Sequence, residues 1–93
     1  MFKTNQYFDG KVTSIALESA EGKATVGVMA AGEYEFDTKT VEIMTVISGQ
    51  LTIQLPDETE WKTYKQFESF RVPKGIKFKV KAIEDTPYLC LYK

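Results

Sequence analysis

The sequence predicts an all-β domain of the barrel or sandwich type, and three observations carry this prediction. Apolar and polar residues alternate along much of the chain, and no segment keeps the apolar spacing of a helix. Turn residues recur roughly every 8–12 positions, as they do in sandwiches and barrels. The 93 residues are about the size of one domain. We therefore expect a single domain over residues 1–93.

About nine short strands are expected. The clearest is Ile76–Ala82, where Lys77, Lys79 and Lys81 alternate with apolar residues and should form a solvated outer face. In chain order the strands are Lys11–Leu17, Ala24–Ala30, Glu33–Phe36, Glu42–Ile47, Leu51–Leu55, Trp61–Tyr64, Ser69–Val72, Ile76–Ala82 and Tyr88–Tyr92.

Turn chemistry separates these strands. Glu21-Gly22 joins the first two, and Ala31-Gly32 breaks the next pair. Ser48-Gly49 lies between two apolar runs, which is typical of a tight hairpin. Pro56-Asp57 and Pro73-Lys74-Gly75 combine residues that restrict φ with residues that tolerate unusual φ, so both are expected turns.

The composition excludes several functional classes. Twelve basic and 13 acidic residues leave a formal charge of −1, which predicts no nucleic-acid partner. No apolar run approaches the ~20 residues of a membrane-spanning helix, and no signal-peptide core follows Met1–Gln6. The single cysteine, Cys90, cannot form an internal disulfide, so we expect a cytoplasmic protein. Cys90 lies in an apolar strand and is expected to be buried and inert.

Two motifs indicate which kind of all-β fold to expect. Glu42 precedes Gly49 by seven positions, and Pro73-Lys74-Gly75 follows later in the chain. The pair resembles the two motifs of the cupin family, which implies a single-domain jelly-roll β-barrel. In the metal-binding cupins, two histidines precede the glutamate and a third follows Pro-x-Gly.

Those metal ligands are missing from this chain, which has no histidine. The early pair would fall near Glu35–Thr38, and the late one falls on Phe78. Histidine and thiolate ligands give a transition-metal site its affinity, so the pocket is expected to hold no metal. An oxygen-only site made by Glu35, Asp37 and Glu42 is the alternative.

The resemblance extends to one particular family of cupins, because segments that match this family occur in order along nearly the whole chain. They are Asn5–Val12, Ala24–Met29, Gly32–Tyr34, Met44–Gly49, Leu55–Asp57 and Tyr88–Cys90. Together they resemble the pyrimidine/purine nucleoside phosphorylases, a family of small cupins. The resemblance implies an enzyme, a pentosyltransferase. It would cleave purine and pyrimidine nucleosides with phosphate to free base and pentose 1-phosphate, using no cofactor besides this co-substrate.

Such a reaction needs a carboxylate or other polar group for the sugar and a cation for phosphate. Glu42 is the candidate for the sugar, because the cupin register aims it into the barrel. Its alternative role is that of a strand-end residue. Arg71, the only arginine, and Lys11 are the competing candidates for phosphate, and either could instead be a surface cation.

The base needs a surface on which to stack, and aromatic rings accept any base. Phe78 stands where a metal ligand would project into the barrel, and Tyr34, Phe36 and Tyr88 are its expected neighbours. The alternative for all four is that they simply fill the core.

Glu42–Ile47 is apolar on both faces, with Met44 and Val46 on one and Ile43 and Ile47 on the other. This excess predicts a second sheet or a partner subunit, most simply in a two-fold homodimer. Two functional alternatives stay open beside the enzyme. One is a metal-free module that binds or senses a nucleoside or sugar, and the other is a structural subunit whose barrel is filled by its own side chains.

Overall fold

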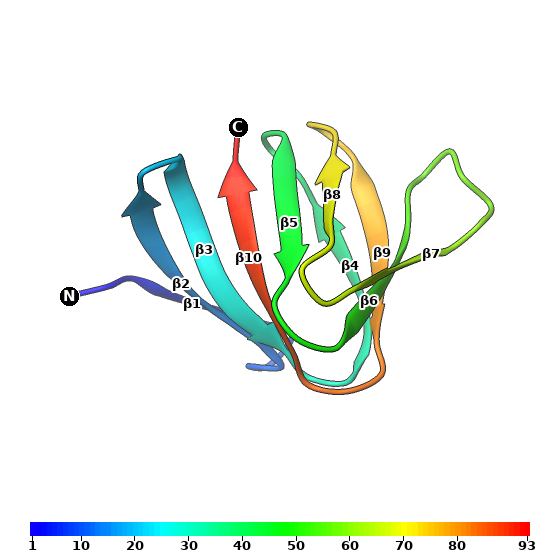
Figure 1. Cartoon of the computed structure of the whole chain (residues 1–93), viewed down its shortest axis with the longest axis horizontal. Coiled ribbons are helices and arrows are strands. Elements are labelled where there is room, and N and C mark those ends of the chain that lie inside the picture. Colours follow the sequence, from blue (N-terminus) through cyan, green and yellow to red (C-terminus); the bar gives the residue numbers. More distant parts are fainter.

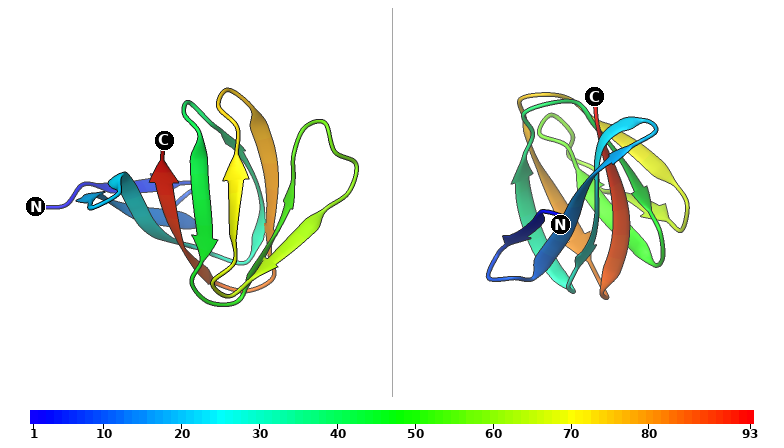
Figure 2. Two further views of the ribbon diagram at one scale, coloured as in Figure 1. Left: turned by 45° about the horizontal axis from the view of Figure 1, so that its top comes forward. Right: turned by 90° about the vertical axis from the view of Figure 1, so that its left-hand side faces the viewer.

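The computed structural model describes residues 1–93, and it contains ten strands and no helix. The strands form two antiparallel sheets that wrap around a common interior (Figures 1 and 2). The six-stranded sheet has the order β1 (Thr4–Tyr7), β2 (Val12–Ser19), β3 (Gly22–Met29), β10 (Thr86–Tyr92), β5 (Glu42–Val46), β8 (Ser69–Val72). The four-stranded sheet has the order β4 (Gly32–Asp37), β9 (Lys77–Ala82), β6 (Gln50–Gln54), β7 (Lys62–Lys65).

The apolar and polar residues that alternate in the sequence lie on the inner and outer faces of the strands. In β9, Phe78, Val80 and Ala82 are buried between the sheets, while Lys77 and Lys79 are exposed on the outside. Lys81 is less exposed than these two lysines, because its ammonium lies 4.0 Å from the centre of the Trp61 ring. The all-β barrel prediction and the strand prediction for this segment are thus confirmed.

Two details differ from the sequence prediction. β1 was not expected, because Thr4–Tyr7 carries no apolar alternation; it pairs only with β2, at the edge of the larger sheet. The prediction of a tight hairpin at Ser48-Gly49 is wrong. The turn exists, with Gly49 at φ 77°, but β5 and β6 belong to different sheets, so the chain crosses the barrel there.

Thr38 fixes the crossing between β4 and β5. Its hydroxyl donates to the Pro73 carbonyl at 2.7 Å and accepts from the Ile76 amide at 3.1 Å. Its own amide and carbonyl also bond to the β8–β9 turn, at Ile76 and Gly75. The loop that follows Thr38 therefore begins from a rigid point at the end of the barrel where β5 starts and β10 finishes (Figure 1).

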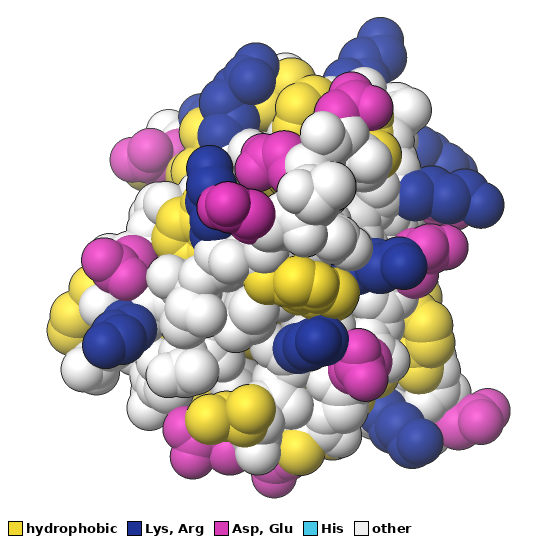
Figure 3. Space-filling model, turned by 90° about the vertical axis from the view of Figure 1, so that its right-hand side faces the viewer, with side chains coloured by type: hydrophobic (Ala, Val, Ile, Leu, Met, Phe, Trp, Pro, Cys, Tyr) yellow, Lys and Arg dark blue, Asp and Glu magenta, His cyan; other side chains and the backbone are white.

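The surface at the β7 side mixes charges of both signs with separated apolar patches (Figure 3). The outer face of the six-stranded sheet is different: Ile15, Val26 and Val28 are exposed there by 44%, 42% and 46%. Because the structure contains no helix, it has no helical segment that could span a membrane.

Candidate functional site

A pocket of about 620 Å³ opens between the two sheets, on the side where β2, β3 and β10 face β4. Inner-face residues of the larger sheet form one wall, and residues of β4, β9 and the β4–β5 loop form the other. The lining residues are Tyr7, Phe8, Ser14, Lys23, Met29, Glu35, Phe36, Asp37, Lys39, Thr40, Glu42, Met44, Phe78, Tyr88, Cys90 and Tyr92. The barrel is therefore not filled by its own side chains.

Glu42 is the acidic group on the inner wall. It is half-buried on the first residue of β5, and burial raises the pKa of its carboxyl above the ordinary value. The thiol of Cys90, 3.5 Å from Oε1, donates a hydrogen bond that partly opposes this rise. Neither of the two ion pairs in the structure involves Glu42. Its carboxylate thus faces the pocket without a cationic partner.

The groups around Glu42 on β10 stay neutral at physiological pH. Burial raises the pKa of Tyr88 to about 12. Burial and the nearby Glu42 charge raise the pKa of Cys90, and burial raises that of Tyr92 despite the hydrogen bond of its hydroxyl with Thr25 at 3.0 Å. The expectation that Cys90 is buried is confirmed, since it is 2% exposed. Among these four neighbouring groups, Glu42 is therefore the only carboxyl group, and the other three supply no negative charge.

Aromatic rings form the opposite wall. Phe36 stacks obliquely on Phe78, with ring centroids 5.7 Å apart, and meets Phe8 edge-on at 5.5 Å. Phe8 reaches this position because it begins a run of three residues with positive φ, namely Phe8, Asp9 and Gly10. Such a conformation is strained for non-glycine residues and turns the ring back over the barrel.

Gly27 makes room for the tyrosine on the inner wall. A Cβ at this position would lie 2.7 Å from the Tyr88 hydroxyl and 2.8 Å from the backbone oxygen of Thr13. Both distances are shorter than real contacts allow, so only glycine lets the Tyr88 side chain lie flat across β3 toward Ser14. The shape of the pocket floor thus depends on a residue without a side chain.

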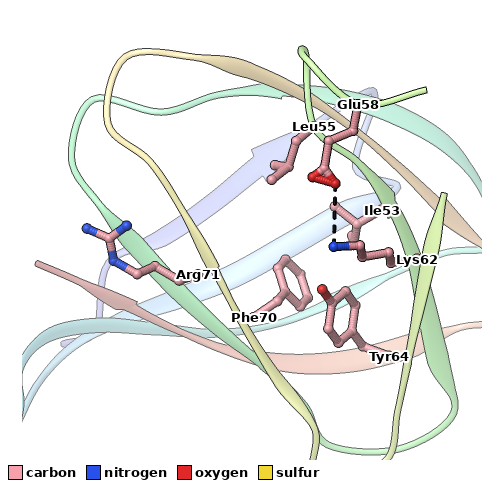
Figure 4. Close-up of a pocket in the computed structure, with 7 residues that line it drawn as sticks. All are labelled: Ile53, Leu55, Glu58, Lys62, Tyr64, Phe70 and Arg71. Atoms are coloured by element: carbon pink, nitrogen blue, oxygen red, sulfur yellow. Dashed lines mark ion pairs between the residues drawn. The ribbon is translucent and has the colours of Figure 1, made fainter. Parts of the chain in front are cut away.

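The structure brings together four of the seven residues expected at the site, namely Glu42, Phe36, Phe78 and Tyr88. Arg71 lies outside, because β8 turns Phe70 and Val72 inward and Arg71 outward. It borders a separate water-sized cleft of about 30 Å³, and its guanidinium points away from the other residues there (Figure 4). An ion pair between Glu58 and Lys62, at 3.6 Å, spans that cleft.

Two other expected residues also lie elsewhere. Lys11 is exposed in the turn between β1 and β2 and does not line the pocket. Tyr34 is buried beneath Phe8, and its hydroxyl donates to the Ala30 carbonyl at 2.6 Å. Tyr34 therefore acts as a support for the aromatic wall rather than as part of its surface.

Sequence reasoning missed Phe8, Lys23, Lys39 and Tyr92. Lys23 had a usable signal, because it shares the inner face of β3 with Thr25, Gly27 and Met29. Phe8 and Lys39 lie in turns, where alternation carries no information about direction.

The oxygen-only metal site does not assemble. Glu35 and Asp37 contribute to the pocket lining, but both alternate with the inward Tyr34 and Phe36 on β4 and are exposed, whereas Glu42 projects from the opposite sheet. No three Cys, Asp or Glu side chains gather where they could hold a metal ion.

Comparison with known proteins places the chain in a family. A model of the pyrimidine/purine nucleoside phosphorylase family matches residues 2–92. A pyrimidine/purine nucleoside phosphorylase of Pseudomonas syringae pv. tomato is 58% identical, and one of Pseudomonas aeruginosa is 54% identical; each match covers 100% of both chains. The chain belongs to the pyrimidine/purine nucleoside phosphorylase family. The family resemblance in the sequence is thus confirmed.

Solved structures of similar proteins share the fold of this family member. A protein of unknown function from Vibrio parahaemolyticus is 39% identical, with a TM-score of 0.93 over 97% of this chain and 96% of that chain. One from Acinetobacter sp. ADP1 is 32% identical, with a TM-score of 0.91 over 98% and 90%. A cupin-2 domain protein from Shewanella frigidimarina, 20% identical, has a TM-score of 0.70 over 96% and 84%. The last likeness supports the cupin-type fold alone, and the prediction of that fold is confirmed.

Proposed function

We propose that the protein is a nucleoside phosphorylase, which converts a purine or pyrimidine nucleoside and phosphate to free base and pentose 1-phosphate. The name carried by its relatives supports this. The observation that carries the proposal is the half-buried Glu42 carboxylate, which faces a pocket of about 620 Å³ without a cationic partner. That volume is within the roughly 300–1,000 Å³ typical of small-molecule sites.

The reaction places positive charge on the sugar carbon C1′ as its bond to the base lengthens. A desolvated carboxylate is costly to hold in the resting site, and a sugar cation or ribose hydroxyls are suitable partners for it. Glu42 would therefore interact most strongly near the transition state, which raises turnover rather than ground-state affinity. The half-buried Phe36 ring, which packs against the buried Phe78, offers a stacking surface on the other wall that does not distinguish among bases.

The two alternatives make different predictions. A structural subunit would have a filled barrel, and the pocket at Glu42 argues against this. A module that only binds or senses nucleosides would use the same pocket without consuming phosphate. Incubating the purified protein with uridine and adenosine, with and without phosphate, and chromatographing the products separates these cases.

Both nucleosides should release base only when phosphate is present, with one pentose 1-phosphate formed for each base. Equal release of base without phosphate would identify a hydrolase instead. Binding of uridine or adenosine with no release of base under either condition would favour the binding module.

No metal and no cofactor other than phosphate is proposed, and no nucleic-acid or membrane partner. We place the protein in the cytoplasm, where phosphate and nucleosides are both available.

The assembly proposed is a two-fold homodimer through the outer face of the larger sheet. Ile15, Val26 and Leu89 stand directly opposite one another on β2, β3 and β10. The outward positions of the four strands β2, β3, β10 and β5 carry no charged residue; they are Thr13, Ile15, Leu17, Ser19, Gly22, Ala24, Val26, Val28, Pro87, Leu89, Leu91, Ile43 and Thr45. A second copy can cover such a face with the same face, as a two-fold axis requires.

A further inference from the structure

Two lysines bring positive charge to the pocket, and both differ from the cations that the sequence suggested. Lys23 and Lys39 line the pocket, whereas Arg71 and Lys11 do not. Neither lysine takes part in an ion pair. A free ammonium beside a concave site is available to an anionic ligand, which it binds as a compact point charge.

Lys23 stands in register with Glu42 across the larger sheet. Tyr92 pairs with Glu42 on β5, and Leu91 pairs with Ala24 on β3, so the next position brings Tyr92 opposite Lys23. Neighbouring strands lie about 4.8 Å apart, which puts the Lys23 and Glu42 backbones roughly 10 Å from each other. A cation and an anion thus flank one tyrosine on the inner wall and do not neutralise each other.

The turn that precedes Lys23 is held in place. The Ser19 hydroxyl donates to the Gly22 carbonyl at 2.8 Å and accepts from the Glu21 amide at 3.1 Å. The Lys93 ammonium donates to the Glu21 carbonyl at 3.1 Å. Glu18 is opposite Lys23 in the β2–β3 pairing but forms no ion pair with it. The ammonium of Lys23 is therefore left for a ligand.

Lys39 approaches from the other wall. It follows Thr38, whose backbone and hydroxyl are bonded to the β8–β9 turn. Thr40, two residues beyond that anchor, also lines the pocket, and its hydroxyl donates to the Val41 carbonyl at 3.3 Å. The loop thus presents the Lys39 cation from a fixed starting point.

We infer that Lys23 is the main phosphate-binding residue of this protein, with Lys39 as the second cation, an inference that rests on the proposed function. Phosphate lies at the Lys23 end of the Lys23–Tyr92–Glu42 row, and the sugar lies over Tyr92 toward Glu42. A phosphate oxygen forms a bond to C1′ while the bond from C1′ to the base nitrogen breaks. The bonding electron pair leaves with the base, and the proton of hydrogen phosphate ends on the base nitrogen.

The positions of Lys23 and Glu42 on either side of Tyr92 keep their two charges separate, which suits the reaction. Had Lys23 and Glu42 been adjacent, each would have neutralised the other and neither would attract its part of the substrates. One intervening strand keeps the backbones of the phosphate-binding and the cation-stabilising residue roughly 10 Å apart.

The test compares Lys23→Met, Lys23→Arg and Lys11→Met, with Lys77→Met on the outer face of β9 as the control. Lys23→Met should raise the KM for phosphate at least tenfold while the KM for uridine changes less than threefold. Lys23→Arg should keep the phosphate KM within about threefold of the wild type, because the charge is retained. Lys11→Met and Lys77→Met should match the wild type.

A second measurement keeps this inference separate from the proposed function. Titration of inorganic phosphate against the protein alone, followed by ³¹P NMR line broadening, should show binding that Lys23→Met weakens at least tenfold. Wild-type phosphate affinity in Lys23→Met would overturn the role of Lys23 even if the enzyme is phosphorolytic. Phosphate binding that depends on Lys23, without any release of base from nucleosides, would uphold the phosphate site and refute the phosphorylase proposal. Lys11→Met raising the phosphate KM in place of Lys23→Met would move the phosphate site to the β1–β2 turn.

Discussion

Replacing Glu42 by Gln tests the residue on which the proposed function depends. The amide nearly preserves the shape of the side chain and removes its charge. Cys90 can still donate to the amide oxygen, so the side-chain hydrogen bond of this residue survives. Any loss of activity then reports on the charge rather than on packing.

The size of the effect follows from the burial of the site. Two unit charges about 4 Å apart interact by roughly 4 kcal/mol at an effective dielectric of about 20, and by about 1 kcal/mol in bulk water. Glu42 is half-buried, so a full sugar cation beside it would be stabilised by about 2–3 kcal/mol. Each 1.36 kcal/mol is tenfold in rate, so kcat should fall by about 10²-fold, the scale typical of one lost electrostatic stabiliser.

The stability of Glu42→Gln should rise although its kcat falls. Because burial raises the pKa of Glu42 in the folded protein, the folded state disfavours the charged carboxylate relative to the unfolded chain. The wild type therefore loses stability as the pH rises through the folded pKa, and Glu42→Gln does not. The variant should melt at a higher temperature than the wild type near pH 7–8, and the difference should shrink as the pH falls below the ordinary carboxyl value of 4.5.

The assay measures kcat for uridine phosphorolysis and the melting temperature across pH, with Glu60→Gln in the exposed β6–β7 loop as the matched control. A folded Glu42→Gln enzyme with near wild-type kcat would refute the electrostatic role. A variant that melts below the wild type at pH 7–8 would show that the carboxylate is a structural anchor.

Other predictions follow from neighbouring features. Gly27→Ala should lower the free energy of unfolding by about 1–3 kcal/mol in denaturant titrations, since the new Cβ would clash with Tyr88 and with backbone; an unchanged midpoint would contradict this. Cys90→Ala removes the donor that lowers the Glu42 pKa, so the acid limb of kcat/KM should move to higher pH; no movement would exclude Glu42 as the titrating group. Dialysis against a chelator should leave both activity and melting temperature unchanged, and activity restored only by added metal would disprove metal independence. Val26→Lys should convert a dimer to a monomer in sedimentation analysis, whereas an unchanged dimer would place the interface elsewhere.

Much of the fold was predictable because alternation records which face of a strand is buried. The pattern in β9 identifies Phe78 and Val80 as inward, and the structure agrees. The same pattern does not say which strands pair. Ser48-Gly49 therefore looked like a hairpin, although the chain passes from one sheet to the other at this turn.

The candidate site was predictable where it lies on strands with a known register. Glu42 and Phe78 are held by the cupin motifs on β5 and β9, and both line the pocket. Arg71 was attractive because it is the only arginine, but rarity of a residue type says nothing about direction. Its neighbours Phe70 and Val72 fill the inner positions of β8, so the guanidinium has to point outward.

By itself, the sequence determined the class of fold, the family and the absence of histidine ligands, because these depend on local pattern and residue identity. Only the tertiary structure decided which charged residues line the same pocket. Lys23 and Glu42 are 19 positions apart and belong to β3 and β5, which never pair; β10, from the far end of the chain, lies between them. The pairing of strands distant in sequence depends on the packing of the whole barrel, so no local pattern could have placed that cation and that carboxylate in one row.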